Sequence, residues 1–183
     1  MLNSKNEIPG IRLKKPLCIG IGGVSRSGKT FLADLLQTAI ADSVVIHQDI
    51  FIPPEAEIPT INGHLDWERP EAIKWLSFSN AIDDALGSGK TVITEGLMVF
   101  QNPEINLHYN KAIFINISRE TFFQRKQSDL RWGREPDWYI NHIWDSYLKF
   151  GQIPSLMKDI LIIDGENDFE LPTILNYLQK TDS

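Results

Sequence analysis

Apolar residues fall in two alternating patterns along this chain. Five short runs are almost continuously apolar and rich in β-branched residues: Cys18–Ile21, Val44–His47, Val92–Thr94, Ala112–Ile117 and Ile160–Ile163. Such runs are typical of strands buried on both faces of a parallel sheet. Between them the apolar residues recur with helical spacing. The alternation predicts an α/β fold with right-handed crossovers, whose ligands bind at the carboxyl ends of the strands.

The expected helices follow the strands in order. The first runs from Thr30 to Ile40, and the second is expected to begin at Pro70, a residue suited to the first helical position, and to end at Gly87. The other helical segments are expected from Ser118 to Arg125, from about Pro136, and around Leu171–Leu178. Two stretches without periodicity, 51–68 and 128–137, are expected to be long loops, which in compact domains are often functional.

A phosphate-binding loop lies between the first strand and the first helix. It reads Gly23-Val24-Ser25-Arg26-Ser27-Gly28-Lys29-Thr30, the pattern G-x-x-x-x-G-K-[ST] in the strand–loop–helix context that it requires. Its glycines let backbone N–H groups surround a polyphosphate at the positive end of a helix. Lys29 would reach the terminal phosphates, and Thr30 would ligate Mg²⁺. The sequence thus predicts a nucleoside triphosphate site in a three-layer P-loop NTPase fold with a five-stranded parallel sheet of order 2-3-1-4-5.

Length and composition add limits to this picture. A chain of 183 residues is expected to form one domain, here residues 17–183, after a flexible tail of residues 1–16. A formal charge of −6 argues against a nucleic-acid partner, and no apolar run approaches the length of a membrane span. A single cysteine excludes an internal disulfide framework. We expect a cytoplasmic protein, or a nucleocytoplasmic one where the cell has a nucleus, and a monomer or weak dimer.

Two carboxylates follow strands that are expected to flank the phosphate loop. Asp49 comes after the second strand, and Glu95 ends the third. Phosphoryl transfer needs positioning, charge neutralisation and a base for the attacking hydroxyl. The pair suggests one carboxylate that manages Mg²⁺ and one that accepts a proton, although each alone could equally be a helix cap or a solvated loop end. The four histidines show no metal-ligand spacing and are interpreted as structural or incidental.

A group of cations stands out in an otherwise acidic chain. It comprises Arg119, Arg125, Lys126, Arg131 and Arg134. Such a group is usually a solvated basic face. The functional alternative, which we favour, is a helical lid at about residues 125–138 whose cations close on the transferring phosphoryl group.

With these motifs the chain resembles the nicotinamide riboside kinases, a branch of the uridine-kinase-like P-loop kinases. The resemblance extends from about Leu17 to Gly165. Besides the phosphate loop, the matching blocks are His47–Phe51, Asn62–Ala72, Ile93–Phe100 and Pro136–Lys149. The phosphate loop is common to many families, whereas residues 67–72 and 142–149 are much more specific.

The resemblance implies roles for the residues around ATP. Asp49 matches the general base toward the ribose 5′-hydroxyl, Glu95 would hold Mg²⁺ through water, and Arg125 matches an ATP-phosphate contact. The catalytic set is then Asp49, Lys29, Glu95 and Arg125, with Thr30, Asp49 and Glu95 around the metal. The expected ATP-binding residues are Gly23, Val24, Ser25, Arg26, Ser27, Gly28, Lys29, Thr30, Phe31, Arg125, Arg131, Asp164 and Gly165, the last two near the adenine.

The resemblance also implies a nucleoside pocket. The indole of Trp67 would stack on the base, the carboxylate of Glu68 would accept hydrogen bonds from the vicinal ribose hydroxyls, and Trp132 in the lid would cover the other face of the base. A pyridinium ring between two aromatic rings gains cation–π attraction. Asp49, Phe51 and Lys126 complete the expected substrate-binding set. The implied activity is ATP-dependent phosphorylation of nicotinamide riboside to nicotinamide mononucleotide.

Three departures from the family pattern keep other functions open: Ile50, Pro53 and Ile140 stand where relatives often have acidic, basic and acidic residues. One alternative is a uridine/cytidine kinase or a kinase for another small alcohol. A second is a nucleotide-binding protein that has lost catalysis. A GTPase-type switch would need Asn-Lys-x-Asp, and the chain offers only Asn110-Lys111 without the Asp.

Overall fold

The computed structural model of the protein describes residues 10–131 and 133–180. Seven strands lie in this part of the chain, and their bounds are β1 Cys18–Gly23, β2 Ser43–His47, β3 Thr60–Ile61, β4 His64–Leu65, β5 Thr91–Glu95, β6 Lys111–Asn116 and β7 Ile160–Asp164. The α-helices described are α1 Lys29–Ala39, α2 Trp75–Gly87, α3 Pro103–Asn106, α4 Arg119–Gln127, α5 Asp137–Phe150 and α6 Leu171–Gln179. Short 3₁₀ helices cover Gln48–Ile50, Glu55–Glu57 and Pro70–Ala72.

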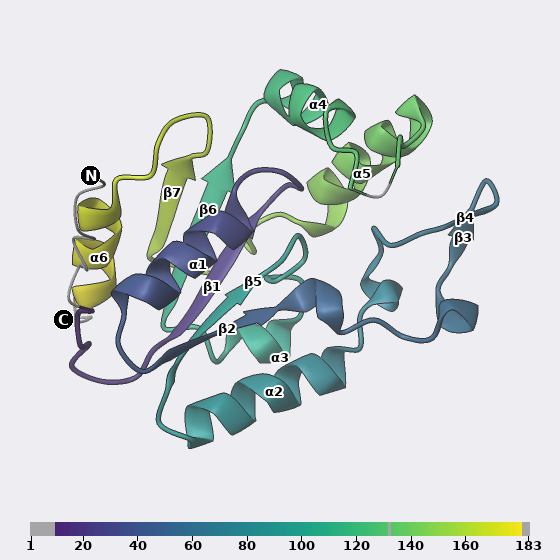
Figure 1. Ribbon diagram of the computed structural model, residues 1–183. Helices are drawn as coiled ribbons and strands as arrows, with labels where there is room; N and C mark the ends of the chain where they lie inside the picture. The colour runs from purple at the N-terminus through teal and green to yellow at the C-terminus, as the bar shows by residue number, and fades with distance from the viewer. Residues whose placement is uncertain (1–9, 132, 181–183) are drawn as a thin grey trace, which may run out of the picture.

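The main sheet is parallel and has five strands in the order β2-β5-β1-β6-β7 (Figure 1). The strands β3 and β4 form a separate antiparallel hairpin that the sequence did not predict. Counted along the chain without that hairpin, the sheet has the expected order 2-3-1-4-5. The strand β1 lies at its centre, and its six residues are all buried, so the phosphate loop leaves the sheet from its middle strand.

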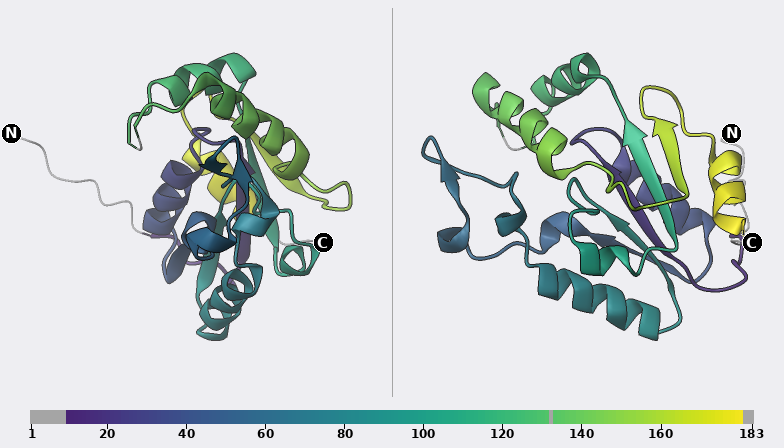
Figure 2. Two further views of the ribbon diagram at one scale, coloured as in Figure 1. Left: turned by 90° about the vertical axis from the view of Figure 1, so that its right-hand side faces the viewer. Right: turned by 180° about the vertical axis from the view of Figure 1, so that it is seen from behind.

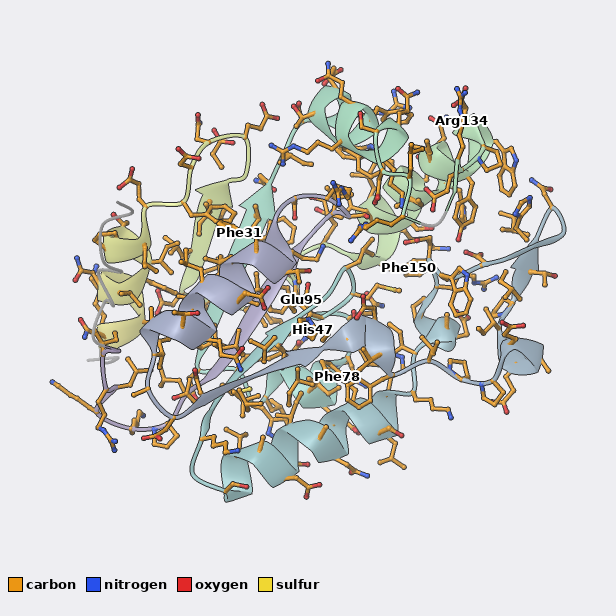
Figure 3. All side chains as sticks on the ribbon, viewed as in Figure 1. Phe31, His47, Phe78, Glu95, Arg134 and Phe150 are labelled. Carbon is orange, nitrogen blue, oxygen red and sulfur yellow. The ribbon has the colours of Figure 1, made fainter. Side chains whose placement is uncertain are left out.

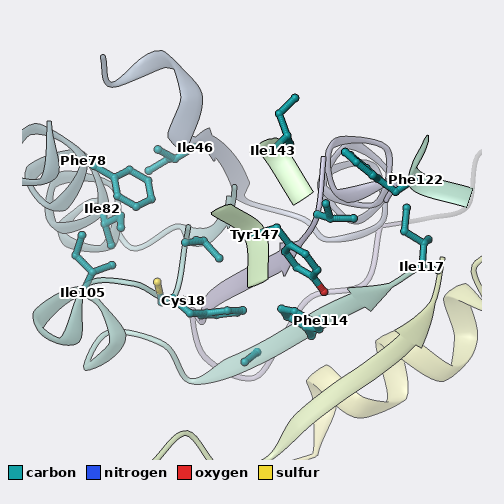
Figure 4. Packing of buried hydrophobic residues seen from close by; sticks show 14 of the residues in the cluster. Cys18, Ile46, Phe78, Ile82, Ile105, Phe114, Ile117, Phe122, Ile143 and Tyr147 are labelled. Atoms are coloured by element: carbon teal, nitrogen blue, oxygen red, sulfur yellow. The ribbon is translucent and has the colours of Figure 1, made fainter. Parts of the chain in front are cut away.

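Side chains from alternate strand positions build two apolar clusters, one on each face of the sheet. On one face Ile19 and Ile21 of β1 pack with Leu32 and Leu36 of α1 and with the apolar side of α6. On the other face the cluster draws on α2, α3, α4 and α5, as Figure 4 shows. Its labelled members are Cys18, Ile46, Phe78, Ile82, Ile105, Phe114, Ile117, Phe122, Ile143 and Tyr147. The fold is therefore the three-layer arrangement that the sequence predicted.

The carboxyl ends of the strands carry the irregular segments. The helices α4 and α5 rise beyond the ends of β6 and β1, and the β3–β4 hairpin projects from the body on the side of α5 (Figures 1 and 2). Tyr139 of α5 donates its hydroxyl hydrogen to the carbonyl oxygen of Leu65 in the hairpin, at 3.3 Å. The hairpin and α5, which are 74 residues apart at this contact, thus meet on the side of the molecule from which the hairpin projects (Figure 1).

Two local predictions need correction or extension. Pro70 does not open the second helix: it begins a 3₁₀ turn, and α2 starts five residues later at Trp75, whose indole N–H donates to the Pro70 carbonyl oxygen at 2.9 Å. In the segment expected to be a tail, Ile11 forms backbone hydrogen bonds with Ala39, the last residue of α1, and with Ala41 just beyond it. None of the helices in the described part of the chain has the length and apolar content needed to span a membrane.

Candidate active site

The phosphate loop has the backbone shape that its two glycines allow. Gly23 has a φ of +144° and Gly28 a φ of +104°, values that side chains disfavour. A Cβ on Gly23 would lie 2.5 Å from the carbonyl oxygen of Ile115 in β6. Gly28 caps α1, so the N–H groups of the first helical turn face the space inside the loop. This arrangement suits an anion such as a phosphate group.

Lys29 is buried beneath the loop that precedes it. Its Nζ donates to the carbonyl oxygen of Val24 at 2.9 Å, which folds the side chain under the loop. Burial lowers the pKa of Lys29, and the carboxylates of Glu95, Glu68 and Asp49 act in the opposite direction. Three acidic side chains from different segments therefore lie within electrostatic reach of this lysine.

Glu95 is the centre of a small polar cluster at the ends of β2 and β5. Its Oε1 accepts a hydrogen bond from the Thr30 hydroxyl at 3.3 Å and lies 2.9 Å from Nδ1 of His47. Figure 3 shows His47 and Glu95 side by side. The Glu95 side chain is only 5% exposed, so its orientation is fixed by these contacts. His47, which was not assigned a role from its sequence context, is thus a partner of the predicted metal-site carboxylate.

Asp49 lies one turn beyond β2, in the 3₁₀ helix Gln48–Ile50. Its side chain is exposed, whereas Gln48 beside it is buried and accepts the backbone N–H of Met98 at 3.0 Å. Gln48 therefore anchors the turn, and Asp49 is exposed at the carboxyl end of β2. That position is open to an acceptor molecule.

Two stacked aromatic rings lie beside Gly28 at the end of the phosphate loop. Phe31, 65% exposed on α1, stacks with Phe169 at a centroid distance of 6.0 Å. The ring of Phe169 also covers Gly28. Gly165 packs closely against Ser27, and Asp164 accepts the backbone N–H of Glu166 at 2.9 Å. The structure brings the expected adenine region together and adds Phe169, which sequence reasoning missed.

The lid cations do not share one environment. Arg125 bridges two loops: it donates to the carbonyl oxygens of Arg26 at 3.1 Å and Gly165 at 2.9 Å. Lys126 pairs with Glu135 at 2.9 Å. Arg119 instead turns to α5, where it donates to Asn141 at 2.8 Å, so it lies apart from the phosphate loop.

The loop after the hairpin presents the expected acceptor residues. Trp67 is 37% exposed, and Glu68 is half-buried. Asp66 precedes them and is almost fully buried: its Oδ1 lies 2.7 Å from Nε2 of His142 in α5 and accepts the backbone N–H of Glu68 at 3.2 Å. The Asp66–His142 contact, which the sequence did not indicate, therefore holds the Glu68 backbone against α5.

Burial raises the pKa of Glu68 to about 7. Lys126 and His142 act against this rise, whereas Glu135 and Asp66 add to it. A carboxylate in this environment gains from hydrogen-bond donors, because they stabilise its charged form. The site therefore favours a ligand that brings hydroxyl groups or a positive charge to Glu68.

Two aromatic residues, Trp132 and Phe51, were expected to contact the substrate. Trp132 lies outside the described residues. Phe51 is half-buried and packs on Phe78 at a centroid distance of 5.4 Å, as part of the core. In the lid, Trp138 at the start of α5 contacts the ring of His64 in the hairpin at 5.2 Å. Trp138 is thus a lid aromatic residue that faces the segment carrying Trp67.

Comparison with known proteins identifies the family. Nicotinamide riboside kinase 1 of Rattus norvegicus is 32% identical to this chain over 174 residues, which is 85% of this chain and 89% of the relative. The chain belongs to the nicotinamide riboside kinase family. Nicotinamide riboside kinase 1 of Homo sapiens is 29% identical over 187 residues, covering 91% and 94% of the two chains. Membership of the nicotinamide riboside kinase family confirms the resemblance drawn from the sequence motifs.

The fold is also found among solved kinases. A possible uridine kinase from Bacillus stearothermophilus superposes with a TM-score of 0.53 over 84% of this chain and 91% of that one, at 17% identity. At this identity the likeness concerns the fold alone. No protein-family model matches the chain.

Proposed function

We propose that this protein transfers the γ-phosphoryl group of ATP to the ribose 5′-hydroxyl of nicotinamide riboside and so forms nicotinamide mononucleotide. The observation that carries the proposal is the phosphate loop with Lys29 buried beneath it and Glu95 hydrogen-bonded to Thr30, with Glu68 and Asp49 within electrostatic reach of Lys29. A phosphate-binding lysine, a metal-side carboxylate and an acceptor-side carboxylate then share one space in a chain of the nicotinamide riboside kinase family.

The phosphate loop fits the donor. Lys29 would neutralise the terminal phosphates, and the first turn of α1 would supply N–H donors to them. The buried hydroxyl of Ser27 has no hydrogen-bond partner among the described residues, and a phosphate oxygen would provide one. Phe31 and Phe169 would cover the adenine beside Asp164 and Gly165.

The residues beside Lys29 also fit Mg²⁺. Thr30 and Glu95 offer oxygen atoms 3.3 Å apart, and this ion commonly uses one or two protein oxygens together with water and phosphate oxygens. When bound, Mg²⁺ would neutralise charge on the phosphates. His47 would orient the Glu95 carboxylate through its 2.9 Å contact.

Asp49 is the proposed base. Its exposed carboxylate would take the proton of the 5′-hydroxyl as that oxygen bonds to the γ-phosphorus, while the bond from phosphorus to the bridging oxygen breaks and ADP leaves. Arg125 already lies across the phosphate loop through its bonds to Arg26 and Gly165. It would support the charge that develops on the transferring group.

The acceptor would lie between the hairpin loop and the lid. Glu68 would accept hydrogen bonds from the two ribose hydroxyls, and Trp67 would stack on the pyridinium ring. Trp138 is placed to approach the same ring from α5. A cationic ring near Trp67 and the acidic side chains gains cation–π and Coulomb attraction that a neutral pyrimidine lacks.

The test is release of ADP from Mg²⁺-ATP with nicotinamide riboside, uridine and cytidine offered in parallel. We expect kcat/KM for nicotinamide riboside to exceed those for both pyrimidines. A preference for uridine or cytidine would overturn the proposed acceptor and keep the phosphate machinery. Binding of ATP without turnover of any of the three would overturn the proposed function.

The matched variant is Asp49→Asn, which removes the base and preserves the size of the side chain. We expect a loss of about a hundredfold or more in kcat, the lower range for a general base, with ATP binding unchanged. Near-normal turnover by this variant would remove Asp49 as the base.

A further inference from the structure

Asp129 lies in the loop between α4 and α5 and is covered by arginine side chains. Its Oδ1 accepts Nε–H of Arg131 at 2.8 Å, and its Oδ2 accepts Nη2–H of the same residue at 2.7 Å. The backbone N–H of Arg131 also reaches Oδ1, at 3.3 Å. The Asp129 side chain is 4% exposed, although its loop lies at the surface. This two-point contact fixes the plane of the guanidinium group.

The same carboxylate reaches the phosphate loop. Nη1 of Arg26 lies 3.6 Å from Oδ2 of Asp129. Arg26 is in the left-handed region with a φ of +66°, and its carbonyl oxygen accepts the hydrogen bond from Arg125. Arg26 of the phosphate loop is therefore contacted twice: α4 reaches its backbone through Arg125, and the loop after α4 reaches its side chain through Asp129.

Asp129 and Arg131 are both charged in this contact. The hydrogen bonds from Arg131 hold the pKa of Asp129 well below its ordinary value, so the carboxylate is ionised. The pKa of Arg131 is raised by Asp129 first and also by the charge of Asp49. Arg131 therefore stands within electrostatic reach of the proposed base as well as of its own partner.

Arg131 keeps donors free for a ligand. A guanidinium group has five N–H donors in a fixed plane. Asp129 engages two of them, on Nε and Nη2. Because the Arg131 side chain is 65% exposed, its other donors remain accessible to a ligand.

We propose that Asp129 is a positioning residue that presents the guanidinium group of Arg131 to the transferring phosphoryl group. The inference rests on the proposed phosphoryl transfer. Arg131 alone would be one flexible cation among several. Held by Asp129, which also contacts Arg26 of the phosphate loop, Arg131 is already oriented before the reaction, so less conformational freedom is lost when the phosphoryl group is transferred.

Two other roles for Asp129 predict different effects on kcat and on ATP binding. If the carboxylate merely neutralises Arg26 and Arg131 until ATP displaces it, removal of its charge strengthens ATP binding and leaves kcat unchanged. If it only stabilises the loop, its removal lowers activity by the same factor whether or not Arg131 is present, because the two effects are then independent.

The experiment is a double-mutant cycle of Asp129→Asn and Arg131→Ala in the full chain. Turnover of nicotinamide riboside and the dissociation constant of ATP are measured for each variant. We expect Asp129→Asn to lower kcat at least tenfold with less than a threefold change in the ATP dissociation constant. In the Arg131→Ala background the same substitution is expected to change kcat less than twofold.

Two further variants complete the design. Glu120→Gln removes one carboxylate from the exposed side of α4 and is expected to leave both readouts unchanged. Asp129→Glu retains the charge and is expected to recover part of kcat, which guards against misfolding of the asparagine variant.

Three results would overturn the inference: an unchanged kcat in Asp129→Asn, an equal loss of kcat with and without Arg131, or tighter ATP binding at unchanged kcat. A wild-type protein that phosphorylates none of the ribosides would overturn the proposed function together with this inference. Normal turnover by wild type and Asp129→Asn alike would overturn the inference alone.

Discussion

Glu68 combines a raised pKa with a position at the proposed ribose. Asp66 and Glu135 repel its charge, Lys126 and His142 attract it, and burial outweighs the difference so that its pKa lies at about 7. Lys126 is itself paired with Glu135, which reduces what it can offer to Glu68. Near neutral pH this residue therefore exists in both protonation states. The ionised carboxylate accepts hydrogen bonds from two ribose hydroxyls better than the protonated acid does, because protonation turns one of its oxygens into a donor and removes the charge.

This balance predicts a pH-dependent KM for nicotinamide riboside. A carboxyl group whose pKa is raised to about 7 is protonated as the pH falls below that value, so binding weakens there. We expect KM to rise by nearly tenfold per pH unit well below 7 and to be constant above 8. Steady-state kinetics between pH 5.5 and 8.5 measure it. Glu68→Gln should show a high KM without this slope, and a wild-type KM that does not vary with pH would contradict the assignment.

The shape of the phosphate loop makes a second prediction at single residues. Gly23→Ala places a methyl group 2.5 Å from a backbone oxygen, at a φ that alanine disfavours, so the loop must shift. We expect at least a tenfold loss in ATP affinity. Gly87→Ala is the matched control, because its Cβ would meet open space at the end of α2. Calorimetric titration with ATP compares the two variants, and normal binding by Gly23→Ala would refute the close fit.

At the scale of elements, the acceptor loop depends on contacts between the β3–β4 hairpin and α5. The buried Asp66–His142 contact of 2.7 Å holds the backbone next to Glu68, and the hydroxyl of Tyr139 reaches the carbonyl oxygen of Leu65. Because α5 also packs into the core through Ile143 and Tyr147, it connects the acceptor loop to the body of the protein.

Removal of His142 should loosen this connection. His142→Ala leaves the Asp66 carboxylate buried without its partner, at a cost of about 1–3 kcal/mol in the free energy of unfolding. We expect KM for nicotinamide riboside to rise at least fivefold, while KM for ATP changes less than twofold. His108→Ala, which removes a looser contact of 3.7 Å with Asp83, serves as the control. Equal changes in both KM values would show that the contact does not act on the acceptor loop.

The elements themselves were largely accessible to prediction. Continuous apolar runs mark the strands of the parallel sheet because both faces of its central strands are covered, although the edge strand β7 leaves Ile162 exposed, and helical spacing marks the apolar side of α1 and α5. The hairpin and the four-residue helix α3 were missed, since such short elements contain too few residues to show a period. The predicted start of the second helix at Pro70 was wrong because a proline in the first turn also suits a 3₁₀ helix.

At the scale of the whole molecule, the site forms where segments distant in sequence meet at the carboxyl end of the sheet. The motif located the phosphate loop, and strand ends located Asp49 and Glu95. Sequence could not indicate that His47 contacts Glu95 or that Asp66 contacts His142, because those pairs are 48 and 76 residues apart and have no local signature. The cationic residues of the lid could be identified in the sequence, but the residues that they contact could not.

The most direct test of the account is the identity of the product. Wild-type protein is mixed with Mg²⁺-ATP and nicotinamide riboside, and phosphorus NMR follows the fate of the γ-phosphoryl group. We predict a new phosphomonoester signal coupled to the ribose 5′ methylene protons, at the rate of ADP formation, and its absence with Asp49→Asn. Appearance of the γ-phosphoryl group only as inorganic phosphate, or on another hydroxyl, would contradict the proposed transfer.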